Sequence, residues 1–128
     1  MNILLVEDDR WLGDMYASAL DAVGVITVHR ASDAAGALEV LDATDVDLLV
    51  LDIFLGEHTG VELLHEMMSY EDCNQIPVVV LSAVHEHNFG MSEERWQHYN
   101  VVKYLYKPQT TPAKLVATLQ KLHTKVKR

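Results

Sequence analysis

The chain has 128 residues, of which 49% are hydrophobic and 23% are charged, and its formal net charge is −9. This length suits a single domain with one continuous core, and this composition excludes a disordered chain. The excess of acidic residues disfavours nucleic acid and anionic membranes as binding partners of the domain.

The N-terminus and the cysteine content predict a cytoplasmic protein. A membrane-spanning helix needs about 20 consecutive apolar residues, but the densest apolar stretch, residues 48–55, is shorter and contains Asp52. No basic leader precedes Glu7, so we expect no secretory signal. Cys73 is the single cysteine and cannot form an internal disulfide, which fits a reducing compartment.

Charge is distributed unevenly along the chain. All 19 acidic residues lie in residues 1–94, whereas residues 95–128 contain eight of the ten basic residues. Such a block commonly serves only to solvate a helix. The alternative is a basic face that pairs with an acidic patch on a partner or on a second copy of the chain. We expect residues 1–128 to form one domain, and residues 121–128 would also suit the start of a linker to an output domain.

Short apolar runs alternate along the chain with segments of helical periodicity. The runs are rich in Val, Ile and Leu and lack strict alternation, which is typical of strands buried on both faces of a parallel sheet. They cover residues 3–6, 25–28, 48–51, 78–81 and 101–105.

Helices are predicted between these runs. Apolar residues spaced three and four apart predict helices over residues 12–23, 34–41, 61–68 and 115–126, with a shorter helix over 92–99. The candidate N-caps are Asp9, Ser32 or Asp33, Thr110 or Thr111, and Ser92, and the third helix opens after Thr59 and Gly60. Residues 85–91 are predicted as loop. Five repeats of strand and helix with right-handed crossovers predict one parallel sheet with helices on both faces, a three-layer α/β/α sandwich.

Polar residues stand where the strands of this sheet end. Glu7 and Asp8 follow the first strand, Asp52 the third and Ser82 the fourth, and Lys107 follows the fifth. Function in an open α/β sheet lies beyond the carboxyl ends of the strands, so we expect these groups to converge at one edge.

Three carboxylates in one crevice need a counter-charge, because like charges raise one another's pKa. Mg²⁺ prefers oxygen ligands and would supply that charge. A carboxylate beside Mg²⁺ can attack a phosphoryl group, while Lys107 neutralises the phosphoryl oxygens and the Ser82 hydroxyl donates a hydrogen bond to one of them.

Four blocks of the sequence resemble the bacterial response-regulator receiver domain. They are residues 3–9 (ILLVEDD), residues 49–52 (LVLD) with Gly60 eight positions on, residues 80–83 (VLSA) and residues 104–108 (YLYKP). Each block alone is weak, but four in order at strand ends, covering nearly the whole chain, are specific. The resemblance implies a flavodoxin-like (βα)5 fold with strand order 2-1-3-4-5.

The resemblance also implies a role for each matching residue. Asp52 would be the phosphoacceptor. Glu7, Asp8, Asp52 and the backbone carbonyl of Phe54 would hold Mg²⁺ or Mn²⁺. Ser82 and Tyr104 would be the switch residues, and Lys107 the lysine that binds the phosphoryl group. A cis peptide bond is expected between Lys107 and Pro108, against about 5–6% of such bonds in general.

As a receiver domain, the chain would act as a signalling switch rather than as an enzyme. A histidine kinase or a histidine phosphotransfer protein would donate the phosphoryl group. The surface formed by helix four, strand five and helix five would then change its affinity for a target, or pair with a second copy as a homodimer.

The sequence departs from the receiver pattern in three places. Gly56 replaces the usual proline and should loosen its loop. The segment between strands four and five is longer than usual, and Asn100 and Val101 replace a Gly-Ala pair, so helix four should be displaced or irregular. Phe54 and Val84 are apolar at positions that govern the access of water to the acyl phosphate, which predicts slow loss of the phosphoryl group.

Other functions fit the residues less well. An aspartate-nucleophile phosphatase generally has a second Asp two residues after the nucleophile, where this chain has Phe54. A flavin phosphate would be repelled by residues 7–9. A metal site at His85 and His87, with His98 nearby, lacks a firm third ligand. A receiver-like module that binds partners without phosphate stays open.

Overall fold

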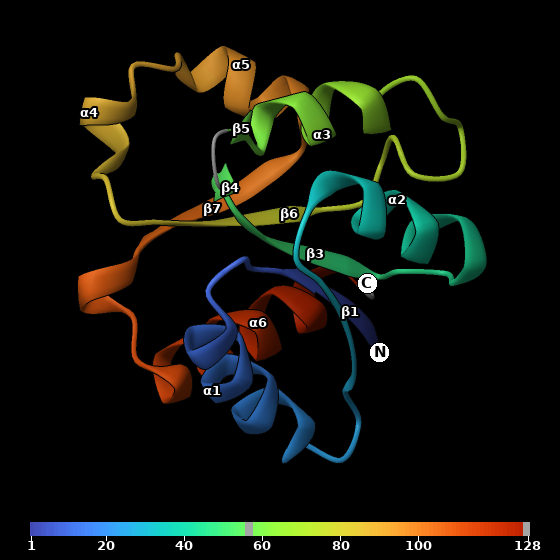
Figure 1. The fold of residues 1–128 in the computed structure, drawn as a ribbon, viewed down its shortest axis with the longest axis vertical. Helices are drawn as coiled ribbons and strands as arrows, with labels where there is room; N and C mark the ends of the chain where they lie inside the picture. Colours follow the sequence, from blue (N-terminus) through green and yellow to red (C-terminus); the bar gives the residue numbers. More distant parts are fainter. Residues whose placement is uncertain (56–57, 127–128) are drawn as a thin grey trace.

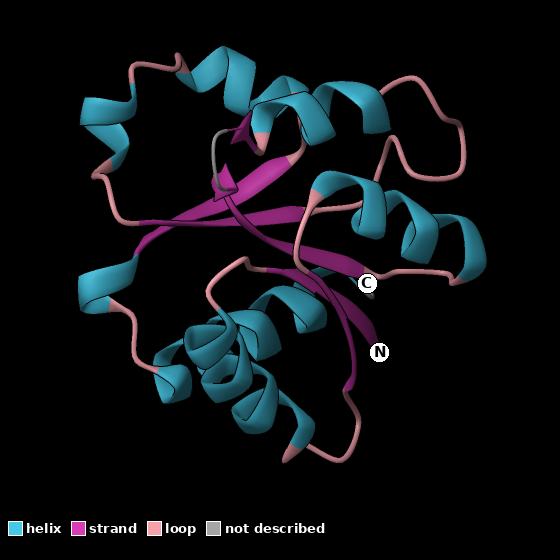
Figure 2. Cartoon of the chain, viewed as in Figure 1, coloured by secondary structure: helices cyan, strands magenta, loops and turns pink. Residues whose placement is uncertain are grey.

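The computed structural model describes residues 1–55 and 58–126 of the chain. Its central sheet has five parallel strands in the order β2-β1-β3-β6-β7, with helices on both faces (Figures 1 and 2). The strands are β1 (Asn2–Val6), β2 (Thr27–Ala31), β3 (Leu48–Asp52), β6 (Val78–Ser82) and β7 (Val101–Tyr106). The predicted three-layer fold and strand order are therefore confirmed.

Helices cover both faces of the sheet (Figure 1). Helices α1 (Arg10–Asp21) and α6 (Pro112–Val126) pack on the first face. Helices α2 (Ala34–Ala43), α3 (Val61–Met67), α4 (Glu86–Phe89) and α5 (Glu93–His98) lie on the second. Within the described residues, no helix combines the length and apolar character that crossing a membrane requires.

The three inner strands explain the apolar runs of the sequence. Every residue of β3 and β6 is buried, and so are residues 3–6 of β1. Successive side chains of a strand point to opposite faces, so Ile3 and Leu5 join the core beneath α1 and α6, while Leu4 and Val6 join the core beneath α2 and α3. Both faces of the inner strands therefore require apolar residues.

Side-chain caps fix where four helices begin. Each capping oxygen accepts a hydrogen bond from a backbone N–H in the first turn, which satisfies a donor that has no partner inside the helix. The caps are Asp9 for α1 (3.0 Å), Asp33 for α2 (2.7 Å), Ser92 for α5 (3.2 Å) and Thr111 for α6 (3.1 Å). The structure thus selects Asp33 and Thr111 where the sequence left two candidates.

The second strand begins at Thr27, two residues later than predicted. Val25 is exposed, and its carbonyl oxygen accepts a hydrogen bond from the Met1 ammonium. The chain enters the sheet afterwards, where Thr27 N–H donates to the Met1 carbonyl oxygen. Because β2 is an edge strand with exposed residues at Thr27 and Arg30, it needs no continuous apolar run.

Helix four is irregular, as expected. It consists of two short helices, α4 and α5, and α4 lies where the sequence predicted only loop. Gly90 separates them with a φ of 84°, a left-handed conformation that ends α4 and that glycine adopts without steric cost.

A small hairpin follows the third strand and was not predicted. Strand β4 (Phe54–Leu55) pairs antiparallel with β5 (His58–Thr59). Gly60 then starts α3 against the sheet, and a Cβ at this position would lie 2.9 Å from a methyl carbon of the buried Leu51. This close approach requires glycine. The predicted loosening at Gly56 lies outside the described residues.

Candidate functional site

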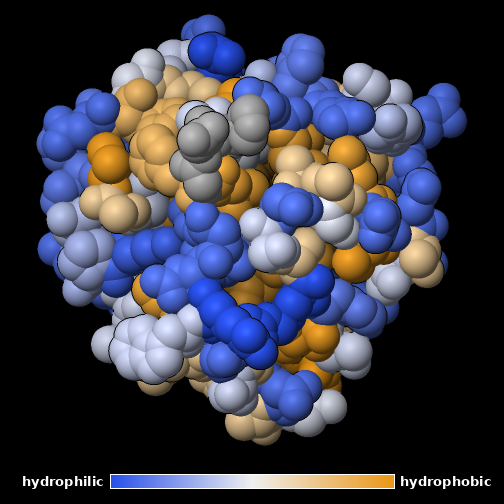
Figure 3. All heavy atoms as spheres, in the orientation of Figure 1, coloured by the Kyte–Doolittle hydropathy of each residue, from blue (hydrophilic) through white to orange (hydrophobic). Residues whose placement is uncertain are grey.

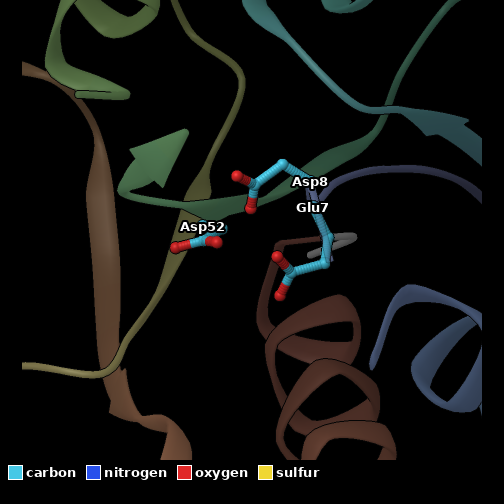
Figure 4. A group of neighbouring side chains, drawn as sticks. All are labelled: Glu7, Asp8 and Asp52. Atoms are coloured by element: carbon cyan, nitrogen blue, oxygen red, sulfur yellow. The ribbon is translucent and has the colours of Figure 1, made fainter. Parts of the chain in front are cut away.

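The polar residues at the strand ends converge at the carboxyl edge of the sheet, as predicted. Glu7 and Asp8 follow β1, and Asp52 ends β3 (Figure 4). One carboxylate oxygen from each of these residues lies within 4.8 Å of the other two. Ser82 ends β6, and Lys107 follows β7.

Lys107 bridges two of the carboxylates. Its Nζ lies 2.7 Å from Glu7 Oε1 and 3.0 Å from Asp52 Oδ2. Glu7 and Asp52 are only 5% and 3% exposed, whereas Asp8 is open to solvent. The partly buried ammonium of Lys107 thus neutralises one of two buried negative charges.

The pKa of Asp52 is raised to about 7. Burial is the largest cause, and the hydrogen bond and charge of Glu7 add to it, while Lys107 partly offsets both. Burial alone would lower the pKa of Lys107, but its hydrogen bonds to Glu7 and Asp52 outweigh burial and raise it. The ammonium therefore stays charged, and the site attracts a further positive charge.

The donor set fits a hard divalent cation. Carboxylate oxygens are the ligands that Mg²⁺ and Mn²⁺ prefer, and Glu7, Asp8 and Asp52 offer three within reach of a common point. Phe54 lies beside them, because its backbone N–H donates to Asp52 Oδ1 over 3.1 Å.

The two predicted switch residues meet at Val84. Ser82 is completely buried, and its Oγ accepts a hydrogen bond from Val84 N–H over 3.0 Å. Tyr104 donates its hydroxyl proton to the Val84 carbonyl oxygen over 2.6 Å. Burial raises the pKa of Tyr104, so its hydroxyl remains a donor. The backbone of one residue thus joins the hydroxyl at the end of β6 to the aromatic ring on β7.

The predicted cis bond between Lys107 and Pro108 is wrong. The peptide bonds of the described residues are all trans, and Pro108 lies in a single 3₁₀ turn, Lys107–Gln109. The trans form of an X–Pro bond is favoured by about 0.5–1 kcal/mol. Lys107 reaches both carboxylates from this trans geometry, so its contacts do not require the rarer isomer.

One residue near the site was missed by the sequence analysis. Tyr16 forms part of the apolar stripe of α1 and is buried, yet its hydroxyl donates to the carbonyl oxygen of Thr110 over 3.1 Å. It thereby ties α1 to the turn that follows Lys107. A tyrosine within an apolar stripe is itself a signal, because a buried phenol hydroxyl usually finds a partner.

The histidines that could suggest a second metal site form a ring stack. The His85 ring lies 3.8 Å from the Tyr106 ring between centroids and 5.3 Å from the His87 ring, nearly parallel to both. Within the described part of the chain, Glu7, Asp8 and Asp52 are the one group of three or more such residues with metal-ligating geometry.

Comparisons with known proteins identify the family of the chain. Residues 3–120 match the family described as the response regulator receiver domain. The transcriptional regulatory protein MalR of Bacillus subtilis (strain 168) is 33% identical over 111 residues, which cover 84% of this chain and 44% of MalR. The polar-differentiation response regulator DivK of Brucella ovis is 27% identical over 113 residues and 87% of both chains.

Solved structures share the fold. A sensor protein from Polaromonas sp. JS666 superposes with a TM-score of 0.82 at 24% identity, covering 98% of this chain and 97% of that one. The chain spans between about a third and about half of the length of the first curated relatives that it matches. The family match extends over nearly the whole chain, and the chain therefore belongs to the response regulator receiver domain family.

Proposed function

We propose that the chain is a phosphorylation-controlled switch in which Asp52 accepts a phosphoryl group from a phosphohistidine. The observation that carries this proposal is the buried Asp52 carboxylate, held at 3.0 Å by Lys107 beside the carboxylates of Glu7 and Asp8. A sensor histidine kinase or a histidine phosphotransfer protein would be the donor.

The transfer step exchanges one bond to phosphorus for another. An oxygen of Asp52 attacks phosphorus, the bond from phosphorus to the donor imidazole nitrogen breaks, and the imidazole keeps the electron pair and takes up a proton. Phe54 N–H holds Asp52 Oδ1 and Lys107 holds Oδ2, which orients the carboxylate. Lys107 then neutralises charge that develops on the phosphoryl oxygens.

Glu7, Asp8, Asp52 and the Phe54 backbone carbonyl would hold Mg²⁺ or Mn²⁺. When bound, the cation offsets the negative charge of the carboxylates and of the incoming phosphoryl group. The raised pKa of Asp52 supports this assignment, because burial and the neighbouring Glu7 both disfavour its negative charge, which a bound cation would offset.

Ser82 and Tyr104 would carry the signal away from Asp52. The Ser82 hydroxyl, which accepts from Val84 N–H, would turn to donate its proton to a phosphoryl oxygen, and the segment that carries Val84 would move with it. Because Tyr104 holds the Val84 carbonyl, it moves with that segment. The surface that changes is the one predicted as helix four, strand five and helix five, formed here by α4, α5, β7 and α6.

This surface would bind the target or a second copy of the chain. Lys103 and Glu86 line two adjoining hollows on it, together with Glu93 in one and Lys114 in the other. Two copies could therefore pair acidic with basic side chains. Lys121→Glu and added salt should weaken association measured by sedimentation; unchanged association would mean that the basic block only solvates α6.

The phosphoryl group should persist. The apolar side chains of Phe54 and Val84 flank the region that water must cross, and Phe54 stands where a turnover phosphatase generally has an acid. We propose that the chain is a switch and no metabolic enzyme. Rapid loss of the phosphoryl group from Asp52 in the presence of Mg²⁺ would contradict this proposal.

The test is intact mass after incubation with Mg²⁺ and acetyl phosphate. We expect one phosphoryl adduct that requires Mg²⁺, disappears in Asp52→Asn and persists in Asp21→Asn, a matched change of an exposed acid on α1. If neither acetyl phosphate nor a phosphohistidine donor gives an adduct, the chain is a phosphate-independent binding module instead.

A further inference from the structure

Four aromatic rings form a continuous row outside the polar site. The centroids of Phe54 and Phe89 are 5.7 Å apart, those of Phe89 and Trp96 5.3 Å, and those of Trp96 and Tyr104 5.6 Å. The first and last pairs meet edge to face, with interplanar angles of 64° and 62°. Rings at such distances and angles attract one another beyond their burial. The row joins β4, α4, α5 and β7. Of these four elements, only β7 belongs to the main sheet, so the hydrogen bonds of that sheet do not link them.

Hydrogen bonds connect both ends of the row to the polar site. At one end, the backbone N–H of Phe54 donates to Asp52 Oδ1. At the other end, the Tyr104 hydroxyl donates to the Val84 carbonyl oxygen, and Val84 N–H donates to Ser82 Oγ. The row is therefore a second connection between the phosphoacceptor and the switch residues, in addition to the strands.

Within this row, the Phe89 ring lies between the rings of Phe54 and Trp96. Helix α4 has four residues, of which Glu86, His87 and Asn88 are exposed, and only Phe89 packs against the core. Apolar side chains gather on the surface in this region, between α4 and β4 (Figure 3). The position of α4 relative to the hairpin therefore depends on the Phe89 ring.

Trp96 is held by packing alone. Its side chain is only 3% exposed, yet its indole N–H has no hydrogen-bond partner in the described structure. A buried indole N–H usually finds an acceptor. The place of this ring is consequently set by its neighbours Phe89 and Tyr104, and a shift of either ring meets no polar restraint at Trp96.

We propose that Phe89 is a positioning residue that couples the backbone beside Asp52 to Trp96 and Tyr104. The inference rests on the proposed function for its signalling consequence. By holding Phe54 on one side and Trp96 on the other, Phe89 makes a change at Asp52 move α4 and α5 together. Without its ring, Phe54 is free to turn, and Trp96 loses the contact that reports on Asp52.

The first experiment uses Trp96 as a reporter in a Trp11→Phe background, so that Trp96 is the single tryptophan. Fluorescence is recorded as Mg²⁺ and then beryllium fluoride, a mimic of a bound phosphoryl group, are added. We expect Phe89→Ala to reduce the response at least threefold and to shorten the lifetime of the phosphoryl adduct by a similar factor. Phe89→Tyr should restore both, and Asn88→Ala, an exposed neighbour, should change neither.

An unchanged response in Phe89→Ala would overturn the inference, provided that circular dichroism shows a native fold. A second measurement does not depend on phosphoryl chemistry. In a double-mutant cycle, Phe54→Leu and Phe89→Leu should show coupling of about 2- to 10-fold in the unfolding equilibrium constant. Additive effects would contradict the row of contacts. If the parent protein forms no adduct but the coupling is present, the proposed function fails while the packing role of Phe89 stands.

Discussion

Strands β3 and β7 both contribute to the site, but they differ in burial and in the number of strands with which they pair. All five residues of β3 are buried, and it pairs with a strand on each side. Strand β7 lies at the edge of the sheet, Val102 and Lys103 are exposed, and its register against β6 shifts after Val78. Asp52 thus ends a rigid strand, whereas Tyr104 lies on a looser one. In the proposed switch, this division would keep Asp52 fixed while the edge responds.

The largest expected effect tests this difference directly. Leu49→Ala on β3 removes a completely buried side chain and leaves a cavity, so it should lower the free energy of unfolding by about 3 kcal/mol. Val102→Ala on β7 removes a side chain that is 46% exposed and should cost less than about 0.5 kcal/mol. Urea denaturation of both variants gives the comparison, and equal losses would show that the edge is as tightly packed as the centre.

The next largest effect concerns the Asp52 carboxylate at the end of β3 and its contribution to the free energy of unfolding. In the folded protein the pKa of Asp52 is about 7, whereas an unfolded chain has an Asp pKa of about 3.9. The folded state therefore binds more protons between these values, and Asp52 makes stability fall as pH rises from about 4 to about 7. In Mg²⁺-free buffer, Asp52→Asn should stabilise the protein by about 2 kcal/mol at pH 8 and have little effect at pH 4.

Asp21→Asn is the control for that measurement, because Asp21 is exposed on α1. Its free energy of unfolding should follow that of the parent protein at both pH values. A stability gain in Asp52→Asn that is equal at pH 4 and pH 8 would show that the effect comes from packing and that the carboxylate carries no penalty for its charge.

The contrast between centre and edge also governs what the sequence could predict. Strands β1, β3 and β6 need apolar residues on both faces, so their positions were evident as continuous runs. The convergence of Glu7, Asp52 and Lys107 followed from one rule, that polar residues at the carboxyl ends of neighbouring parallel strands share an edge. The acidic site was therefore predictable without any knowledge of side-chain contacts.

The edges were harder to predict, because burial there is partial. The apolar run 25–28 placed the start of β2 two residues too early, because the strand itself begins with the exposed Thr27. Helix α4 has one half-buried residue and therefore no stripe. The isomer of the Lys107–Pro108 bond depends on tertiary geometry, which local sequence does not encode. The row of rings from Phe54 to Tyr104 is likewise visible only once four elements are placed in space.

A smaller effect is expected at the entry to β7. Asn100 has a φ of 62°, a left-handed conformation, and its side-chain amide donates to the Asn74 carbonyl oxygen. Asn100→Ala should lower the free energy of unfolding by about 1–2 kcal/mol, because alanine is disfavoured in this conformation and the hydrogen bond is lost. Asn100→Gly keeps the backbone preference and should cost less. Thermal or urea unfolding of the two variants measures both losses. Equal losses in Asn100→Ala and Asn100→Gly would assign the whole effect to the hydrogen bond.

The smallest effect lies at the opposite edge, where Arg30 of β2 pairs with Asp14 of α1 at 2.6 Å. The two side chains are 42% and 57% exposed, so the pair should contribute no more than about 0.5 kcal/mol in a double-mutant cycle and nothing measurable in about 1 M salt. The Arg30 guanidinium also lies over Gly13, where a Cβ would come within 2.6 Å of its Nη2. A coupling between Arg30 and Asp14 well above about 0.5 kcal/mol would mean that this ion pair stabilises the packing of β2 against α1. The two edges would then differ, and β7 would be the looser one.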